Sequence, residues 1–194
     1  MEKMCDVVRK EDDDDKIEVL MVVCGGTIDK DYPRTTKGYA FEFGDEPGIT
    51  RVLKRVQPLE VPFKVHVLYQ KDSQDMTKED RMKLMNLCRN AKQNRILITH
   101  GTDTMIESAV LLGQANLQNK SIVLTGSMRP QRFENTDAHF NVGYALGVLS
   151  LIKPGSTMVC MNGMARAWNQ VRRCLRTGKF VRGTPRAIEK NIAS

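Results

Sequence analysis

Five short apolar runs, separated by segments of helical periodicity, constrain the fold of this chain more than any other feature. Each run has the length of a strand buried on both faces. The runs span residues 17–23, 64–69, 95–100, 121–126 and 157–162. Regular alternation of strands and helices predicts an α/β fold, with an open, mostly parallel sheet covered by helices on both faces, in the three-layer style of flavodoxin-like or Rossmann-like domains.

Start signals for the intervening helices support this pattern. Pro47 is well placed as the first residue of one helix, because its missing N–H is not needed there. A last helix is expected over residues 136–151. Two pairs resemble capping boxes that begin the middle helices, namely Thr77 with Asp80 and Thr104 with Glu107.

The length of 194 residues suits a single domain. We expect that domain over residues 17–183, after a disordered leader at 1–16 and before a tail at 184–194. The leader ends in "EDDDDK", the enteropeptidase recognition pattern, and has no apolar core typical of a signal peptide, so a cytoplasmic location is expected. The long connection at 29–46 predicts a lid over a ligand site.

Composition excludes several classes of function. No apolar stretch reaches the roughly 18 residues that a membrane span needs. The five cysteines and three histidines form no metal-binding spacing, so we expect free thiols and no metal. The formal charge of +7 is concentrated near the C-terminus, but Trp168 and Phe180 are the only aromatic residues there, so a solvated basic surface is favoured over nucleic-acid binding.

Small polar residues follow four of the predicted strands. Because the carboxyl ends of parallel strands form the ligand crevice of an open sheet, these segments are expected to converge on one pocket. Single segments of this kind are ordinary turns and caps, whereas four together favour a site. The segments are Gly25 to Thr27, Asp72 to Gln74, Gly101 to Asp103, and Gly126 with Ser127.

The pocket chemistry predicted from these residues suits a small zwitterion. A threonine such as Thr27 becomes a nucleophile only when another group takes its proton. Backbone N–H groups of Gly25, Gly26, Thr102 and Asp103 are expected to form an oxyanion hole. Asp103 or Asp72 can hold an ammonium group, while Ser73 and Gln74 can bind a carboxylate. The sequence contains no nucleotide-binding fingerprint. The residues alone therefore leave two hypotheses open, a hydrolase or a binding protein for such a ligand.

In its motifs the chain resembles the N-terminal, catalytic domain of the bacterial-type L-asparaginases, which are threonine amidohydrolases. The matching motifs cover nearly all of residues 17–183 in the family's order. They are "GGTID" at 25–29, "DSQDM" at 72–76, "ITHGTDTM" at 98–105, "VLTGSMRP" at 123–130, "DAHFN" at 137–141 and "MNG" at 161–163.

This resemblance implies roles for particular residues. Thr27 is implied as the nucleophile and Thr102 as the second catalytic threonine, and no cofactor is implied. The implied substrate site consists of Gly26, Asp72, Ser73, Gln74, Gly101, Thr102 and Asp103.

Two helper positions depart from the family pattern. Phe41 replaces the family's loop tyrosine, with Tyr39 nearby as a substitute, and Arg173 replaces its catalytic lysine. Arginine supplies charge but no base, because it stays protonated.

The resemblance covers only the first domain of ordinary family members, so the chain is expected to be a short, single-domain form. We expect self-association, as a homodimer, to cover surface that a second domain covers elsewhere. Two functional hypotheses follow. One is an amidohydrolase for asparagine or a related small amide; the other is a weak or inactive member that binds an amino-acid-like ligand.

Overall fold

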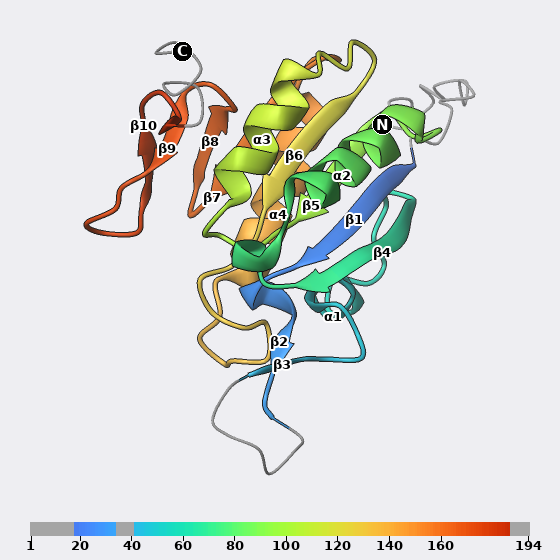
Figure 1. Ribbon diagram of the computed structural model, residues 1–194. Helices are drawn as coiled ribbons and strands as arrows, with labels where there is room; N and C mark the ends of the chain where they lie inside the picture. The colour runs from blue at the N-terminus through green and yellow to red at the C-terminus, as the bar shows by residue number, and fades with distance from the viewer. Residues whose placement is uncertain (1–17, 34–40, 187–194) are drawn as a thin grey trace, which may run out of the picture.

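The computed structural model describes residues 18–33 and 41–186. Its centre is a six-stranded sheet in the order β4-β1-β5-β6-β7-β8 (Figure 1). The strands are β1 (Val19–Gly25), β4 (Phe63–Lys71), β5 (Arg95–Thr99), β6 (Ser121–Thr125), β7 (Thr157–Met161) and β8 (Met164–Ala167). The first five are parallel, and β8 is antiparallel to β7. The predicted mostly parallel sheet is therefore confirmed.

Helices cover both faces of the sheet, as predicted. One face packs on α2 (Lys78–Asn90) and α3 (Met105–Gln114), and the other on α1 (Gly48–Lys54) and α4 (Ala138–Leu151) (Figure 1). Successive residues of a strand point to opposite faces. Leu20 and Val22 of β1 accordingly join the cluster with α2 and α3, whereas Met21 and Val23 join the cluster with α1 and α4. The core thus has two apolar layers, one on each side of the sheet.

Helix starts follow the predictions in part. The Thr77 capping box is present, with reciprocal hydrogen bonds to Asp80. Thr104 precedes α3 but its hydroxyl does not cap that helix, so this prediction was wrong. Pro47 is the N-cap of α1 and not its first residue. The first residue is Gly48, whose N–H donates to Oδ1 of Asp29 at 2.6 Å.

The strand order creates a switch point between β1 and β5. After β1 the chain crosses to β4 on one side, and then returns past β1 to form β5 on the other side. In an open sheet a crevice opens where the order reverses, outside the carboxyl ends of the two strands. Gly26 follows β1 and Gly101 follows β5 closely. Two of the predicted site segments therefore lie where this topology places a ligand.

Several short strands were not predicted from the sequence. A two-residue turn at Asn162 and Gly163, both with positive φ, reverses the chain into β8. Two antiparallel pairs lie outside the main sheet, β9 (Val171–Arg173) with β10 (Phe180–Arg182), and β2 (Lys30–Asp31) with β3 (Glu42–Phe43). Val171 is buried in the core cluster of α3, which fixes the β9–β10 ribbon against the domain.

The described residues contain no helix that is long and apolar enough to cross a membrane. In the same part of the chain, no group of three or more acidic, histidine or cysteine side chains is arranged to hold a metal ion. The cysteines that the structure describes, Cys24, Cys88, Cys160 and Cys174, are free thiols. The predicted leader at 1–16 and residues 187–194 of the predicted tail lie outside the described residues.

Candidate functional site

Three of the predicted site segments are in close contact at Gly26, Gly101 and Ser73. A Cβ atom built on Gly26 would lie 2.2 Å from the Cα of Gly101, and one on Gly101 would lie 2.6 Å from the Oγ of Ser73. Gly26 has φ 83° and ψ −174°, a conformation open essentially to glycine alone. Gly26 is therefore required for both its conformation and its close approach, and Gly101 for its close approach alone. Together they bring the loops after β1, β5 and β4 into contact.

Both threonines proposed from the family resemblance stand directly after these contacting glycines. Thr27 follows Gly26 and begins the short 3-10 helix η1 (Thr27–Asp29), where it is half-buried. Thr102 follows Gly101 and is 6% exposed. The contact between the two glycines therefore places both threonines at the carboxyl edge of the sheet, next to the switch point.

The buried His100 supports the loop that carries Thr102. Its Nδ1 hydrogen-bonds the carbonyl of Gly101 at 2.9 Å, and its Nε2 lies 2.8 Å from the hydroxyl of Ser108. Complete burial lowers the pKa of His100 to about 4. The imidazole is therefore neutral at pH 7, with Nδ1 donating to the carbonyl and Nε2 accepting from the hydroxyl. It acts as a structural brace beside the site.

Ser73 begins the 3-10 helix η2 (Ser73–Asp75) after β4 and is 1% exposed. Its carbonyl accepts a hydrogen bond of 2.6 Å from the hydroxyl of Thr104, and its Oγ accepts one of 3.4 Å from the N–H of Thr104. The Thr104 hydroxyl is thus committed to Ser73, which explains why it does not cap α3. This pair joins the second and third site segments.

Asp103 lies at the centre of a charged network. Gln74 donates to its Oδ2 at 2.6 Å, and the guanidinium of Arg173 donates to its Oδ1. Burial raises the pKa of Asp103, but the hydrogen bonds from Gln74 and Arg173 and the charges of Arg173 and Lys30 outweigh it and hold the pKa below its usual value. The carboxylate is therefore ionised and already paired with a cation.

Lys30 is a site residue that the sequence reasoning missed. Its Nζ lies 2.6 Å from Oδ2 of Asp72, and its charge acts on Asp103. It stands on β2, three residues after Thr27. The only signal in the sequence was a lysine close behind the proposed nucleophile, in a segment predicted to be a lid. Site residues from four segments are thus joined as two ion pairs, Lys30 with Asp72 and Arg173 with Asp103.

One predicted oxyanion-hole donor is already engaged in the structure. The N–H of Gly26 donates to the carbonyl of Lys71 at 2.9 Å. Lys71 is the last residue of β4, so this bond continues the pairing of β1 with β4 and leaves no N–H of Gly26 for a ligand. Gly26 contributes to the site through its close approach to Gly101 and not through its amide.

The predicted lid is anchored at both of its described ends. β2 and β3 pair there, and Arg132 binds Oδ2 of Asp31 at 2.9 Å. Phe41 packs edge-on against Tyr32 and Phe133, with ring centroids 6.0 and 5.4 Å away. Residues 34–40, including the predicted Tyr39, lie outside the described residues. Both described ends of the connection are therefore fixed by contacts with the domain, and the lid itself stays a prediction.

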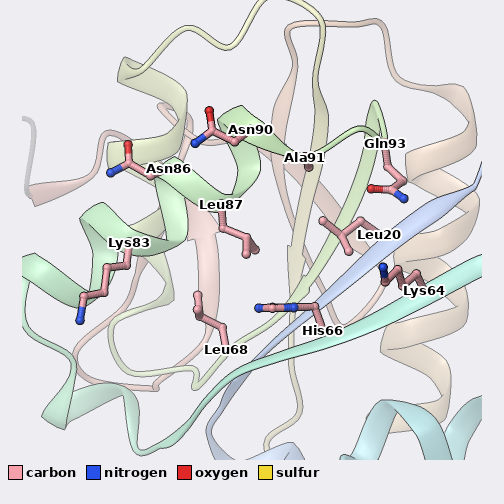
Figure 2. Close-up of a pocket in the computed structure, with 10 residues that line it drawn as sticks. All are labelled: Leu20, Lys64, His66, Leu68, Lys83, Asn86, Leu87, Asn90, Ala91 and Gln93. Atoms are coloured by element: carbon pink, nitrogen blue, oxygen red, sulfur yellow. The ribbon is translucent and has the colours of Figure 1, made fainter.

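A separate cavity of about 500 Å³ opens between β4 and α2 (Figure 2). Its lining includes Leu20 and Lys64, near the amino ends of their strands, and Lys83, Leu87 and Asn90 of α2. None of the predicted site residues lines this cavity. It therefore lies away from the carboxyl edge, where the threonines and the two ion pairs are found.

The site thus combines an open α/β sheet with a threonine after each of the two switch-point strands. The chain matches the family model described as "Asparaginase, N-terminal" over residues 18–181. The chain therefore belongs to the asparaginase family.

Relatives and solved structures agree with this assignment. Over 155 residues the chain is 30% identical to a glutaminase-asparaginase of Acinetobacter glutaminasificans, covering 76% of this chain and 46% of the relative. It is 27% identical to an L-asparaginase of Bacillus licheniformis, covering 75% and 46%. The fold matches the L-asparaginase of Thermococcus kodakarensis with a TM-score of 0.70 at 23% identity, covering 85% and 51%. The chain spans about half the length of these relatives.

Proposed function

We propose that this protein is an amidohydrolase that converts a small amide to the acid and ammonia through a threonine nucleophile. The observation that carries the proposal is the contact between Gly26 and Gly101, which brings Thr27 and Thr102 to the switch point of the sheet. Membership of the asparaginase family supports amide hydrolysis as the reaction class. Asparagine is the reference substrate, since the names of the relatives include asparaginase and glutaminase.

The proposed reaction has two steps. In the first, the Thr27 oxygen bonds to the amide carbon, the C–N bond breaks, and the proton of the hydroxyl leaves with the nitrogen as ammonia. In the second, water attacks the resulting ester, the acid departs, and a proton returns to the Thr27 oxygen. The negative charge on the carbonyl oxygen would be stabilised by N–H groups at Thr102 and Asp103, since the N–H of Gly26 is engaged.

Ser73, Gln74 and Asp103 are the proposed contacts for the non-reacting end of the substrate. Gln74 and Asp103 form one hydrogen-bonded unit, and Ser73 is held by Thr104. Such fixed partners suit positioning, because a substrate held in one orientation places its carbonyl at the nucleophile. Gly101 and Asp72 lie beside them, Gly101 against Ser73 and Asp72 paired with Lys30.

A second function, binding of an amino-acid-like ligand without turnover, is favoured by two departures from the family pattern. Arg173 is paired with Asp103 at the position where the family resemblance places a lysine. Since arginine does not release its proton, it cannot serve as a base for Thr102. Phe41, in an aromatic cluster, likewise has no proton to transfer.

Ammonia release by the purified protein tests the two functions. Asparagine, glutamine and a panel of small amides are compared for wild type, Thr27→Ala and the matched control Thr177→Ala, an exposed threonine in the β9–β10 turn. We expect release by wild type and the control, and its loss in Thr27→Ala with an unchanged thermal midpoint. Absence of release from every amide, together with saturable ligand binding that Ser73→Ala weakens, would instead support the binding protein.

The expected homodimer and cytoplasmic location stay proposals. The outer face of α4 supports self-association, because it is apolar and exposed; we call Phe140, Gly143, Tyr144, Gly147 and Leu151 the α4 face. Phe140 is 59% and Leu151 85% exposed. Location is to be tested by cell fractionation, since one relative, from Haemophilus influenzae, is named a probable periplasmic L-asparaginase.

A further inference from the structure

The cavity between β4 and α2 has the volume and the lining of a small-molecule site. We infer that it binds a single-chain carboxylate, with the apolar chain in the middle of the cavity and the anionic head group at one end. This site is separate from the proposed amidohydrolase site, because none of the candidate site residues lines the cavity. The inference therefore does not depend on the proposed function.

An apolar floor runs through the middle of the cavity. It consists of Leu20 of β1, Leu68 of β4, Leu87 of α2 and Ala91, which directly follows α2 (Figure 2). Leu20 is 6% exposed, whereas Leu68 and Leu87 are only half-buried. The volume of about 500 Å³ lies within the range of roughly 300–1,000 Å³ that is usual for ligand pockets. An apolar chain laid on these leucines would remove further apolar surface from water, which favours binding.

The sequence of the edge strand β4 explains why α2 leaves this part of the sheet open. Lys64 pairs with Leu20 in the register of β4 with β1, and His66 pairs with Val22. Leu20 and Val22 belong to the core cluster on the α2 side, so their partners on β4 point to that side as well. Both partners are polar and exposed, and they line a cavity where apolar residues would pack against the helix. The cavity is therefore a consequence of the residues that β4 presents to α2.

The polar groups of the cavity favour an anion. None of the described residues that line it is acidic. Lys83, Asn86 and Leu87 lie at helical spacing on the face of α2 that borders the cavity. Oδ1 of Asn86 accepts a hydrogen bond of 3.2 Å from Arg89, so the N–H groups of the Asn86 amide remain as donors. An ammonium group and an amide donor on one helix face match the two oxygens of a carboxylate.

The two ends of the cavity differ in charge, which orients the ligand. Because β4 and β5 are parallel, α2 runs back along the sheet, so Lys83 lies toward the carboxyl end of β4 and Gln93 toward its amino end (Figure 2). Gln93 donates to the carboxylate of Glu18, which adds a negative charge at that end. The ligand carboxylate is therefore placed at Lys83. From there to Ala91, eight residues on, the helix rises about 12 Å, which is close to the extended length of octanoate.

Calorimetry with straight-chain ligands tests this inference on the unmodified protein. We expect octanoate to bind more tightly than butanoate, by about three- to fourfold for each added methylene that is buried. Octylammonium has a chain of the same length and the opposite charge. It should bind at least about tenfold more weakly than octanoate, because Lys83 repels it.

Variants locate the bound octanoate. Lys83→Glu should weaken octanoate at least about tenfold, because it reverses the charge at the head group, and Lys83→Gln should weaken it less. Lys78→Glu is the matched control, since Lys78 is an exposed lysine of the same helix that does not line the cavity. Ser73→Ala, at the carboxyl edge of the sheet, separates the cavity from the candidate functional site. Neither of these two variants should change the affinity for octanoate.

Several results would overturn the inference. Failure of the wild type to bind octanoate would do so, as would octylammonium binding as tightly as octanoate. Equal affinities of butanoate and octanoate would show that the apolar floor is not used. Weakening by Ser73→Ala and not by Lys83→Glu would place the carboxylate in the candidate functional site instead. Lys83→Gln takes the place of Lys83→Glu if the latter does not fold, and the comparison of the three ligands requires no variant.

Discussion

The guanidinium of Arg173 donates to the carboxylate of Asp103, across 70 positions of sequence. The pair joins β9, part of a ribbon outside the main sheet, to the loop after β5, in which Thr102 stands. Asp103 is kept ionised by this pair and by Gln74. The short ribbon near the C-terminus is therefore part of the candidate site, although its strands contribute nothing to the central sheet.

Replacement of Arg173 by lysine should increase turnover. Lysine keeps the positive charge beside Asp103 but can lose a proton, so it can assist Thr102 as a base. We expect kcat for asparagine to rise at least about tenfold, which is a part of the roughly 10²–10⁴ that general base catalysis contributes. Arg176→Lys, in the exposed β9–β10 turn, is the control. Unchanged kcat in Arg173→Lys would show that the site does not use a base at this position.

Replacement of Gly26 by alanine should destabilise the protein, because it separates the loops after β1 and β5. The new Cβ would meet the main chain of Gly101 at 2.2 Å, in a backbone conformation that only glycine adopts freely. We expect a loss of more than about 2 kcal/mol in the free energy of unfolding, measured with urea. Gly143→Ala is a matched control, because its Cβ meets nothing within 4 Å and the residue lies inside α4. There we expect a gain of about 0.5–1 kcal/mol, because alanine favours helix. Equal effects of the two substitutions would contradict the backbone contact.

Asp29 should make stability fall as the pH rises. Burial raises its pKa to about 7 from 3.8, against the lowering effects of the Gly48 N–H and Arg51. Between these two values the folded state binds more protons than the unfolded state, so the free energy of unfolding decreases from about pH 4 to pH 7. Asp29→Asn keeps an acceptor for Gly48 without a charge. We expect this variant to match wild type near pH 4 and to exceed it above pH 7.

Urea denaturation at a series of pH values measures this difference. Asp75→Asn, an exposed aspartate in η2, is the control and should leave the pH dependence unchanged. A difference between Asp29→Asn and wild type that is constant with pH would show that Asp29 is not protonated in the folded protein.

Disruption of the α4 face should reduce self-association. Phe140 stacks on Tyr144 with ring centroids 6.1 Å apart, and both lie on the outer side of α4. A charge buried in an interface without a partner is costly, so Phe140→Glu should shift the protein toward monomer. Sedimentation velocity measures the shift, with Met82→Glu on α2, 38% exposed, as the control. Identical sedimentation of wild type and Phe140→Glu would place any contact between copies elsewhere.

Apolar runs and helical periodicity were sufficient to predict the central architecture. The runs at 17–23 and 95–100 correspond to β1 and β5, whose residues are buried on both faces of the sheet. A strand buried on both faces needs apolar residues at every position, so it is recognisable as a continuous apolar run. The short strands were missed because they lack such apolar runs. β9 and β10 have three residues each and are exposed in part, so their composition does not distinguish them from loops. β8 was detectable, since Asn162 and Gly163 form the pair typical of a two-residue hairpin.

The candidate site was predictable where it depends on strand ends and unpredictable where it depends on long side chains. Gly26, Ser73 and Gly101 meet because their strands are adjacent, and that follows from the parallel order. The contact of Lys30 with Asp72 crosses from the lid segment to another loop, and no periodicity encodes it. The engaged N–H of Gly26 likewise depends on the position of Lys71, which only the folded structure provides.

The contact between Gly26 and Gly101 has a consequence for how such a site tolerates change. No side chain lies between the two glycines, so the spacing of the loops that carry Thr27 and Thr102 depends on the register of β1 with β5. Core side chains do not take part in this contact, so their replacement acts on it only through the positions of the two strands. Deletion of a single residue within β1 or β5 would displace one hydroxyl by about 3.3 Å, the rise of one strand residue, and separate the pair. Lineages of this domain should therefore vary freely in core composition while conserving the lengths of these two strands.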